Sequence, residues 1–176
     1  MIAENINADR LVLSILDASG VGDRYLSWMT NPLVVRYLES RFEAPTISGL
    51  GDFVEQMRKS KDSYFFGIFV ANEHVGNIKL GPVNLHHSRA SMGVIIGEES
   101  AWGKGIATAA IQALTNWAFD TLGLHKITAG SYAENLGSIR AFEKAGYEIE
   151  GRLRNEVVLV DGTRSDTILL GKSRVR

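Results

Sequence analysis

Apolar residues along this chain recur at two spacings, which predict strands in some segments and helices in others. Leu11, Leu13 and Ile15 alternate with their neighbours, which is typical of a strand with one buried face. Residues 64–71 are apolar throughout, which favours a buried strand, and residues 72–74 predict a hairpin turn after it. The expected strands cover residues 11–16, 64–71, 75–83, 90–96, 126–132, 147–160 and 163–173.

Helices are predicted where apolar residues recur every three or four positions. The strongest such segment is residues 105–122, whose apolar run stops at Gly123, a residue typical of helix ends. The other expected helices are a short one capped by Asp23, one from Asn31 and Pro32 toward Phe42, and ones over residues 46–59 and 138–145.

The order of these elements indicates a mixed α/β fold. Strands lie before and after one strand-loop-helix crossover, which favours a sheet that is partly antiparallel and flanked by helices. Gly81 and Pro82 predict a bend in their strand, and the Asp161-Gly162 pair predicts a final hairpin. We find no linker or internal repeat and therefore expect a single domain over residues 1–176.

Composition excludes several classes of function. The formal net charge of −1 argues against a protein that binds nucleic acid by neutralising its backbone. The chain has no cysteine, so it has no disulfide, thiolate metal site or cysteine nucleophile. His86 and His87 are adjacent on an extended segment, point to opposite sides and have no evident third ligand, so we expect no metal site.

The first ten residues lack the basic patch and apolar core of a signal peptide. No apolar run approaches the roughly 20 residues that a membrane-spanning helix requires. The absence of cysteine also fits a reducing compartment. We therefore expect a soluble cytoplasmic protein with no membrane partner, whether it is a monomer or a homodimer.

A glycine-rich turn between a predicted strand and the longest helix is the strongest candidate for chemistry. Gly103 and Gly105 permit a tight turn, and the free amides at the start of a helix attract an anion such as pyrophosphate. Lys104 is followed by glycine instead of Ser or Thr, which excludes a nucleoside-triphosphate loop. Thr108 replaces the third glycine of a dinucleotide-binding loop. A turn that only joins strand to helix remains the alternative.

Four segments together resemble the GNAT N-acetyltransferases, most closely the branch with the ribosomal-protein alanine N-acetyltransferases. The resemblance covers most of the chain from about residue 64 onward. It implies a mostly antiparallel sheet that is splayed between its fourth and fifth strands. It also implies acetyl-CoA as donor, a primary amine as acceptor, and direct transfer. The segments are Trp-Gly-Lys-Gly-Ile-Ala-Thr at 102–108, Asn-Leu-Gly-Ser at 135–138, Phe-Glu-Lys-Ala-Gly-Tyr at 142–147 and Glu-Gly-Arg at 150–152.

The resemblance also implies which residues bind the coenzyme. Trp102 stands where many members have Gln or Arg, so another group must supply that phosphate contact, and Lys104 is the candidate. The resemblance places a β-bulge at Ile95 and Ile96, where a free amide polarises the thioester carbonyl and the pantetheine arm pairs with the strand. Asn135 matches the residue that contacts this arm. The pyrophosphate is expected on the backbone of Gly103, Gly105, Ile106, Ala107 and Thr108.

A second departure from the family concerns the general acid. Many members have a tyrosine that protonates the leaving thiolate, and Phe142 occupies that position here, where we expect it to contact the coenzyme. Ser138, one helical turn earlier, is the available hydroxyl and our candidate acid. The alternative for Ser138 is an N-cap role alone. A thiol has a pKa near about 8.5, so the thiolate also leaves without strong assistance.

The acceptor amine must lose a proton before it attacks, so we looked for a base. A lysine-like amine with a pKa of about 10.4 needs more help at neutral pH than an α-amino group with a pKa near 8. Glu98 and Glu99, just past the fourth strand, are the nearest carboxylates in the sequence, and Glu39 is a rival. Glu39 and Arg41 are also the candidate acceptor-binding residues, although solvated loop positions are the common alternative for such charges.

These observations lead to one main hypothesis and two rivals. The main hypothesis is an acetyl-CoA-dependent N-acetyltransferase that acts on a small primary amine, with an amino sugar as one candidate. The first rival acetylates a protein N-terminus. The second is a coenzyme A-binding domain without catalysis, supported only by the missing tyrosine.

Overall fold

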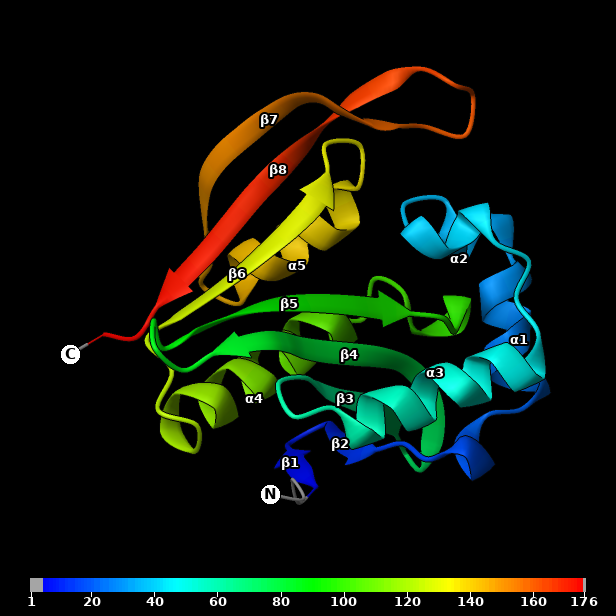
Figure 1. Ribbon diagram of the computed structural model, residues 1–176, viewed down its shortest axis with the longest axis horizontal. Helices are drawn as coiled ribbons and strands as arrows, with labels where there is room; N and C mark the ends of the chain where they lie inside the picture. Colours follow the sequence, from blue (N-terminus) through cyan, green and yellow to red (C-terminus); the bar gives the residue numbers. More distant parts are fainter. Residues whose placement is uncertain (1–4, 176) are drawn as a thin grey trace.

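The computed structural model describes residues 5–175, and their strands form one eight-stranded sheet in the order β1-β2-β3-β4-β5-β6-β8-β7 (Figure 1). Neighbouring strands are antiparallel except β5 and β6, so the expected mixed, mostly antiparallel sheet is confirmed. Residues 1–4 and 176 of the expected domain lie outside this description. The strands are β1 (Ile6–Ala8), β2 (Leu11–Ile15), β3 (Tyr64–Val70), β4 (Glu73–Asn84), β5 (Arg89–Ile96), β6 (Lys126–Tyr132), β7 (Glu148–Val158) and β8 (Arg164–Ser173).

Helices cover both faces of the sheet (Figure 1). One face carries α1 and α3, whose buried residues pack with the Phe65 and Phe69 side of β3. The other face carries α4 and α5, which pack on the Ile78 and Leu80 side of β4. The helices are α1 (Asp23–Thr30), α2 (Pro32–Val35), α3 (Ile47–Lys59), α4 (Ile106–Asp120) and α5 (Leu136–Lys144), with single 3-10 turns at Ala18–Gly20, Glu39–Phe42 and Glu99–Ala101.

Local predictions differ from the structure mainly at helix starts and in one short strand. Strand β1 was not predicted from the sequence, because its three residues are too few to show an alternating pattern. Asp23 is the first residue of α1 and does not cap it, since Gly22 precedes the helix and no side chain caps it. The helix expected from Asn31 toward Phe42 ends at Val35, four residues after its Asn31 cap.

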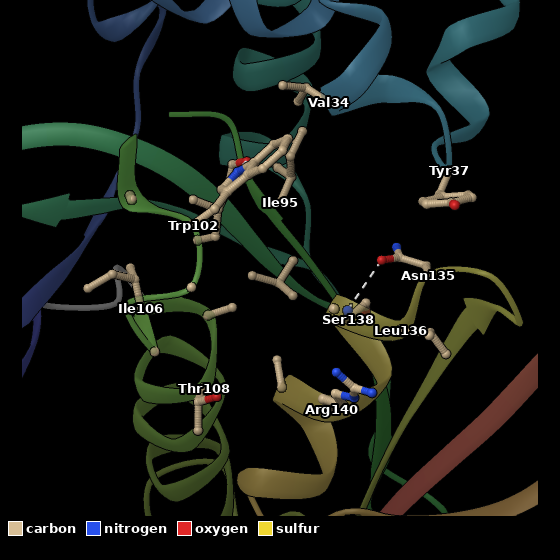
Figure 2. A pocket seen from close by; sticks show the side chains of 18 of the residues that line it. Val34, Tyr37, Ile95, Trp102, Ile106, Thr108, Asn135, Leu136, Ser138 and Arg140 are labelled. Atoms are coloured by element: carbon tan, nitrogen blue, oxygen red, sulfur yellow. Dashed lines mark hydrogen bonds between the residues drawn. The ribbon is translucent and has the colours of Figure 1, made fainter. Parts of the chain in front are cut away.

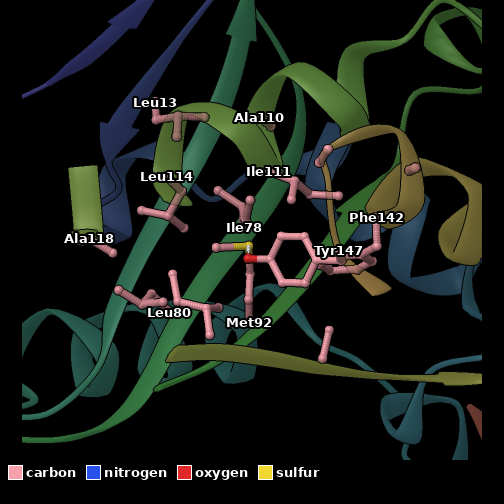
Figure 3. Close-up of a cluster of buried hydrophobic side chains, with 14 of the residues drawn as sticks. Leu13, Ile78, Leu80, Met92, Ala110, Ile111, Leu114, Ala118, Phe142 and Tyr147 are labelled. Atoms are coloured by element: carbon pink, nitrogen blue, oxygen red, sulfur yellow. Dashed lines mark hydrogen bonds between the residues drawn. The ribbon is translucent and has the colours of Figure 1, made fainter. Parts of the chain in front are cut away.

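The main core lies between the sheet and α4 (Figure 3). Ile78 of β4 and Ile111 of α4 are fully buried there, as the amphipathic patterns of both elements predict. The Tyr147 ring enters this cluster at the start of β7, and its hydroxyl lies 2.8 Å from the Thr115 hydroxyl. Burial raises the pKa of this phenol, so Tyr147 stays protonated. Its ring meets Phe142 edge to face at 5.0 Å.

The sheet divides between β5 and β6. These parallel strands pair only through Arg89, Ala90 and Ser91, although β5 continues to Ile96. Beyond Ser91 the strands diverge, while β6 stays paired with β8 along its whole length (Figure 1). The splay that the family resemblance implies between these strands is therefore present. It exposes the last half of one edge of β5 inside the molecule.

Glycine at position 97 is required by its contact with Trp28, which is 4% exposed. A Cβ atom at Gly97 would lie 2.1 Å from Trp28 Cδ2. We expect Gly97→Ala to lower the free energy of unfolding by about 2 kcal/mol, because the indole is packed and must shift. Urea denaturation followed by circular dichroism measures this change.

The matched control is Gly93→Ala in β5, four residues before Gly97, where a Cβ atom would meet nothing within 4 Å. We expect this variant to change the free energy of unfolding by less than about 1 kcal/mol. Equal urea midpoints for the two variants would show that the Trp28 contact does not restrict position 97.

Candidate functional site

The turn before α4 leaves an uncapped helix start. Gly103 and Gly105 have φ of 72° and 77°, a left-handed conformation that favours glycine at both positions. Gly105 is the N-cap and no side chain caps the helix. The Ala109 amide is the first to donate to Gly105 O, at 3.0 Å, so the amides before it have no partner within α4. The turn thus has the backbone geometry at which the sequence predicts anion binding, and the binding itself stays a prediction.

A cavity of about 520 Å³, here the first cavity, lies over this helix start and is walled by α2, β5 and α5 (Figure 2). Its walls contain all the residues predicted to bind coenzyme except Lys104 and Phe142. Its cations are instead Arg36, Arg140 and Lys144. Arg140 and Lys144 are one turn apart on α5, a spacing that sequence reasoning overlooked.

Trp102 connects the glycine turn to β5. Its indole Nε1 donates to the Ile96 carbonyl at 2.8 Å, and its side chain is 38% exposed along the first cavity (Figure 2). The bulky residue in this position therefore holds the turn against the strand end. This hydrogen bond also satisfies the Ile96 carbonyl, one of the backbone acceptors on the splayed edge of β5.

The β-bulge expected at Ile95 and Ile96 lies two residues later, at Gly97 and Glu98. The amides of Gly97 and Glu98 both donate to the Val75 carbonyl, at 3.0 and 3.1 Å, the two-to-one pattern of a bulge. From Met92 to Ile96 the pairing with β4 is regular, with Ile95 opposite Asn77. The alternation of an antiparallel ladder then directs the backbone groups of Ile96, and not those of Ile95, toward the gap.

Asn135 and Ser138 lie where α5 begins, on the opposite side of the gap (Figure 2). Asn135 is the N-cap, and its Oδ1 accepts from the Ser138 amide at 3.2 Å. Ser138 therefore does not cap the helix, so its expected alternative role is wrong. The cap also explains why α5 begins at Leu136, two residues earlier than predicted.

A second cavity, of about 690 Å³, lies on the other side of the gap between α3, the 3-10 turn at Glu39–Phe42 and the ends of β6 and β7. The two cavities meet, because they share six wall residues. The shared residues are Tyr37, Leu38, Val94, Ile95, Asn135 and Ser138. Ligands that enter from opposite sides would therefore meet beside Ile95 and Ser138.

The expected acceptor residues Glu39 and Arg41 have different positions. Glu39 lines the second cavity and accepts a hydrogen bond from the Tyr132 hydroxyl. Arg41 lines neither cavity and donates to Leu38 O at 2.9 Å, to the Tyr132 hydroxyl at 3.0 Å and to Val158 O. Burial and then the Glu39 hydrogen bond raise the pKa of Tyr132, which keeps this phenol protonated.

The other predicted catalytic residues are only partly brought together. Ser138 lies at the junction of the cavities, but Glu98 and Glu99 line neither of them. Glu99 accepts from Asn31 Nδ2 at 2.7 Å beside α2. Phe142, predicted to contact coenzyme, is 2% exposed and lines the second cavity.

Two polar residues of β4, Asn77 and Lys79, also line the second cavity and were not predicted. A polar residue at every second position of an otherwise apolar strand was the available signal, since such residues share a face. Within residues 5–175, no group of three or more potential metal ligands occurs. No described helix is long and apolar enough to cross a membrane.

Comparison with known proteins places this geometry in a family. The model of the acetyltransferase (GNAT) domain matches residues 10–148. Spermidine N(1)-acetyltransferase of Escherichia coli (strain K12) is 31% identical over 127 residues, 72% of this chain and 67% of the relative. The probable N-acetyltransferase YjcK of Bacillus subtilis (strain 168) is 34% identical over 108 residues, 60% of this chain, and the match spans only 59% of that relative's length.

Solved structures share the fold. Spermidine N-acetyltransferase from Vibrio cholerae, in complex with CoA and spermine, superposes with a TM-score of 0.82 at 22% identity, covering 94% of this chain and 96% of that one. RimL, a ribosomal L7/L12 alpha-N-protein acetyltransferase in complex with coenzyme A, gives 0.86 at 18% identity, covering 97% of this chain and 98% of that one. From the family match and the shared splayed sheet, we conclude that this chain belongs to the GNAT acetyltransferase family.

Proposed function

We propose that this protein transfers an acetyl group from acetyl-CoA directly to a primary amine of a small molecule. The observation that carries this proposal is the meeting of the two cavities at Val94, Ile95 and Ser138. Donor and acceptor approach each other there from opposite sides, so the amine attacks the thioester without an acyl-enzyme. The chain also lacks cysteine, the most nucleophilic side chain at neutral pH.

In this proposal, acetyl-CoA occupies the first cavity. The pyrophosphate binds the amides from Gly103 to Thr108, where the helix dipole adds to the attraction. Arg36, Arg140 and Lys144 supply positive charge for the remaining phosphate of the coenzyme. The pantetheine arm follows the β5 edge at Val94 and Ile96, and the Asn135 side chain faces it from α5.

The acceptor occupies the second cavity, and its amine must be neutral to attack. Deprotonation of an amine with a pKa of about 10.4 costs roughly 4.6 kcal/mol at pH 7, so a base assists. Glu39 takes this role, directly or through water, because Glu98 and Glu99 lie outside the cavity. The new N–C bond forms as the C–S bond breaks, and Glu39 receives the amine proton. The Ser138 hydroxyl donates its proton to the thiolate and takes one from solvent.

The acceptor is proposed only as a primary amine of a small molecule. The relatives compared above are named for spermidine, or for a ribosomal protein N-terminus, and none is named for an amino sugar. The test is release of free CoA from acetyl-CoA with a panel of small amines, an amino sugar and N-terminal peptides. Turnover of small amines supports the proposal. Turnover of peptides alone, or acetyl-CoA binding without turnover, contradicts it.

The cations of α5 provide a test of the donor site. We expect Arg140→Gln combined with Lys144→Gln to raise KM for acetyl-CoA about tenfold, because two partly screened phosphate contacts are lost. The value of kcat should change little, since neither residue lies at the cavity junction. Steady-state kinetics with a thiol reagent measures both constants.

The matched control is Lys59→Gln, which removes a charge from the end of α3, outside both cavities. Its KM should equal that of the unmodified protein. An unchanged KM in the Arg140 and Lys144 double variant would place the phosphates of the coenzyme elsewhere.

Replacement of Ser138 tests the assigned general acid. We expect Ser138→Ala to lower kcat by about tenfold or more and to leave KM for acetyl-CoA unchanged, because the lost proton transfer occurs only in the transition state. The unfolding free energy should not change, since Asn135 provides the helix cap.

Tyr37 is the other hydroxyl-bearing side chain on the shared wall, so Tyr37→Phe is the comparison. A lower kcat in Tyr37→Phe, with full activity in Ser138→Ala, would reject Ser138 as the acid.

A further inference from the structure

Asn77 presents an unsatisfied hydrogen-bond donor at the second cavity. The residue is 1% exposed and lines the cavity wall. Its Oδ1 lies 2.9 Å from His74 Nε2, and the Tyr25 hydroxyl lies near its side chain, but its Nδ2 makes no hydrogen bond within the described part of the chain. Buried amide nitrogens in proteins nearly always have an acceptor. An unpartnered one at a cavity therefore points to a ligand that supplies the acceptor.

The surroundings of His74 orient this amide. The His74 ring lies among aromatic rings, stacked on Phe69 at 4.9 Å and edge to face with Trp28 at 4.9 Å. Burial lowers the pKa of His74, so the imidazole is neutral at pH 7 and carries one N–H. With that proton on Nε2, the ring donates to Asn77 Oδ1, and the amide Nδ2 is left for the cavity.

Lys79 adds a cation on the same face of β4, two residues along. Within residues 5–175 it forms no salt bridge or hydrogen bond, although Glu39 and Glu43 line the same cavity. Opposite it in β5 is Gly93, where a Cβ atom would meet nothing within 4 Å. The missing side chain leaves open space at the strand position opposite Lys79.

We infer that the acceptor is a primary amine that also carries an anionic oxygen group, a carboxylate or a phosphate, bound by Lys79 and Asn77. This inference rests on the proposed function. The second cavity holds separate positive and negative groups that do not pair with each other. A zwitterionic acceptor satisfies both, with its amine toward Glu39 and its anionic oxygens toward β4.

A simple polyamine fits this cavity less well. Such an acceptor carries only cations, so binding would leave Asn77 without an acceptor and bring a positive charge toward Lys79. The relatives named for spermidine thus share the fold and family of this chain, while Lys79 favours a different acceptor.

Pairs of amines that differ only in the acidic group test the inference. The carboxylate arm compares L-lysine with cadaverine and β-alanine with propylamine, and the phosphate arm compares phosphoethanolamine with ethanolamine. We expect kcat/KM to be at least about tenfold higher for the acidic member of the pairs in one arm. The favoured arm identifies the group as carboxylate or phosphate.

Lys79→Met separates recognition by Lys79 from the intrinsic reactivity of each amine. We expect it to lower kcat/KM for the acidic acceptor by about tenfold, with no loss for its matched amine and no change in KM for acetyl-CoA. Asn77→Leu should act in the same direction. The control is Lys61→Met, which removes an exposed lysine outside both cavities.

Failure of this inference is distinguishable from failure of the proposed function. Equal or better turnover of cadaverine or spermidine, unaltered in Lys79→Met, overturns the inference and keeps the acetyltransferase. Absence of turnover with every amine overturns the proposed function. In that case a thermal shift in the presence of CoA still decides the inference. Stabilisation by acidic amines that disappears in Lys79→Met supports it, and its absence rejects it.

Discussion

The short parallel contact between β5 and β6 is the constraint on which the rest of this structure depends. Pairing stops at Ser91, and beyond it the edge of β5 has no strand partner although it lies inside the molecule. Backbone amides and carbonyls away from water require partners, so such an edge is stable only beside solvent, a side chain or a ligand. Trp102 supplies one partner at the Ile96 carbonyl, and the two cavities provide access to the remainder.

The two cavities use different kinds of chemistry. The first relies on backbone, because glycine geometry and a helix start create an anion site whatever the neighbouring side chains. The second relies on side chains, and its walls come from segments distant in sequence. Arg41 holds these segments together, since it joins the 3-10 turn at Glu39–Phe42 to Tyr132 of β6 and Val158 of β7. Side chains therefore determine the walls of the second cavity, whereas backbone forms the helix start at the first cavity, whose cations are Arg36, Arg140 and Lys144.

The substitution at Phe142 has a structural explanation. Its ring packs edge to face against Tyr147, whose own hydroxyl is held by Thr115 in the core. This position thus contributes an apolar contact to the junction of α5 and β7, and hydroxyl groups at the meeting of the cavities come from other positions. The Ser138 hydroxyl is one of these groups, and it is not used to cap α5 because Asn135 is the N-cap.

Much of the fold was determined by the sequence alone, because its signals depend on near neighbours. Alternating apolar residues, the Gly103 and Gly105 turn and the long apolar helix placed the strands, the crossover and the anion-binding backbone. The site was predictable where backbone forms it, and less so where side chains do. Glu98 and Glu99 were near the site in sequence but lie outside the cavities, whereas Glu39 reaches the second cavity from a 3-10 turn, and Asn77 and Lys79 reach it from β4. Only the tertiary structure decided this, since strand pairing and the splay bring together residues whose spacing along the chain has no fixed period.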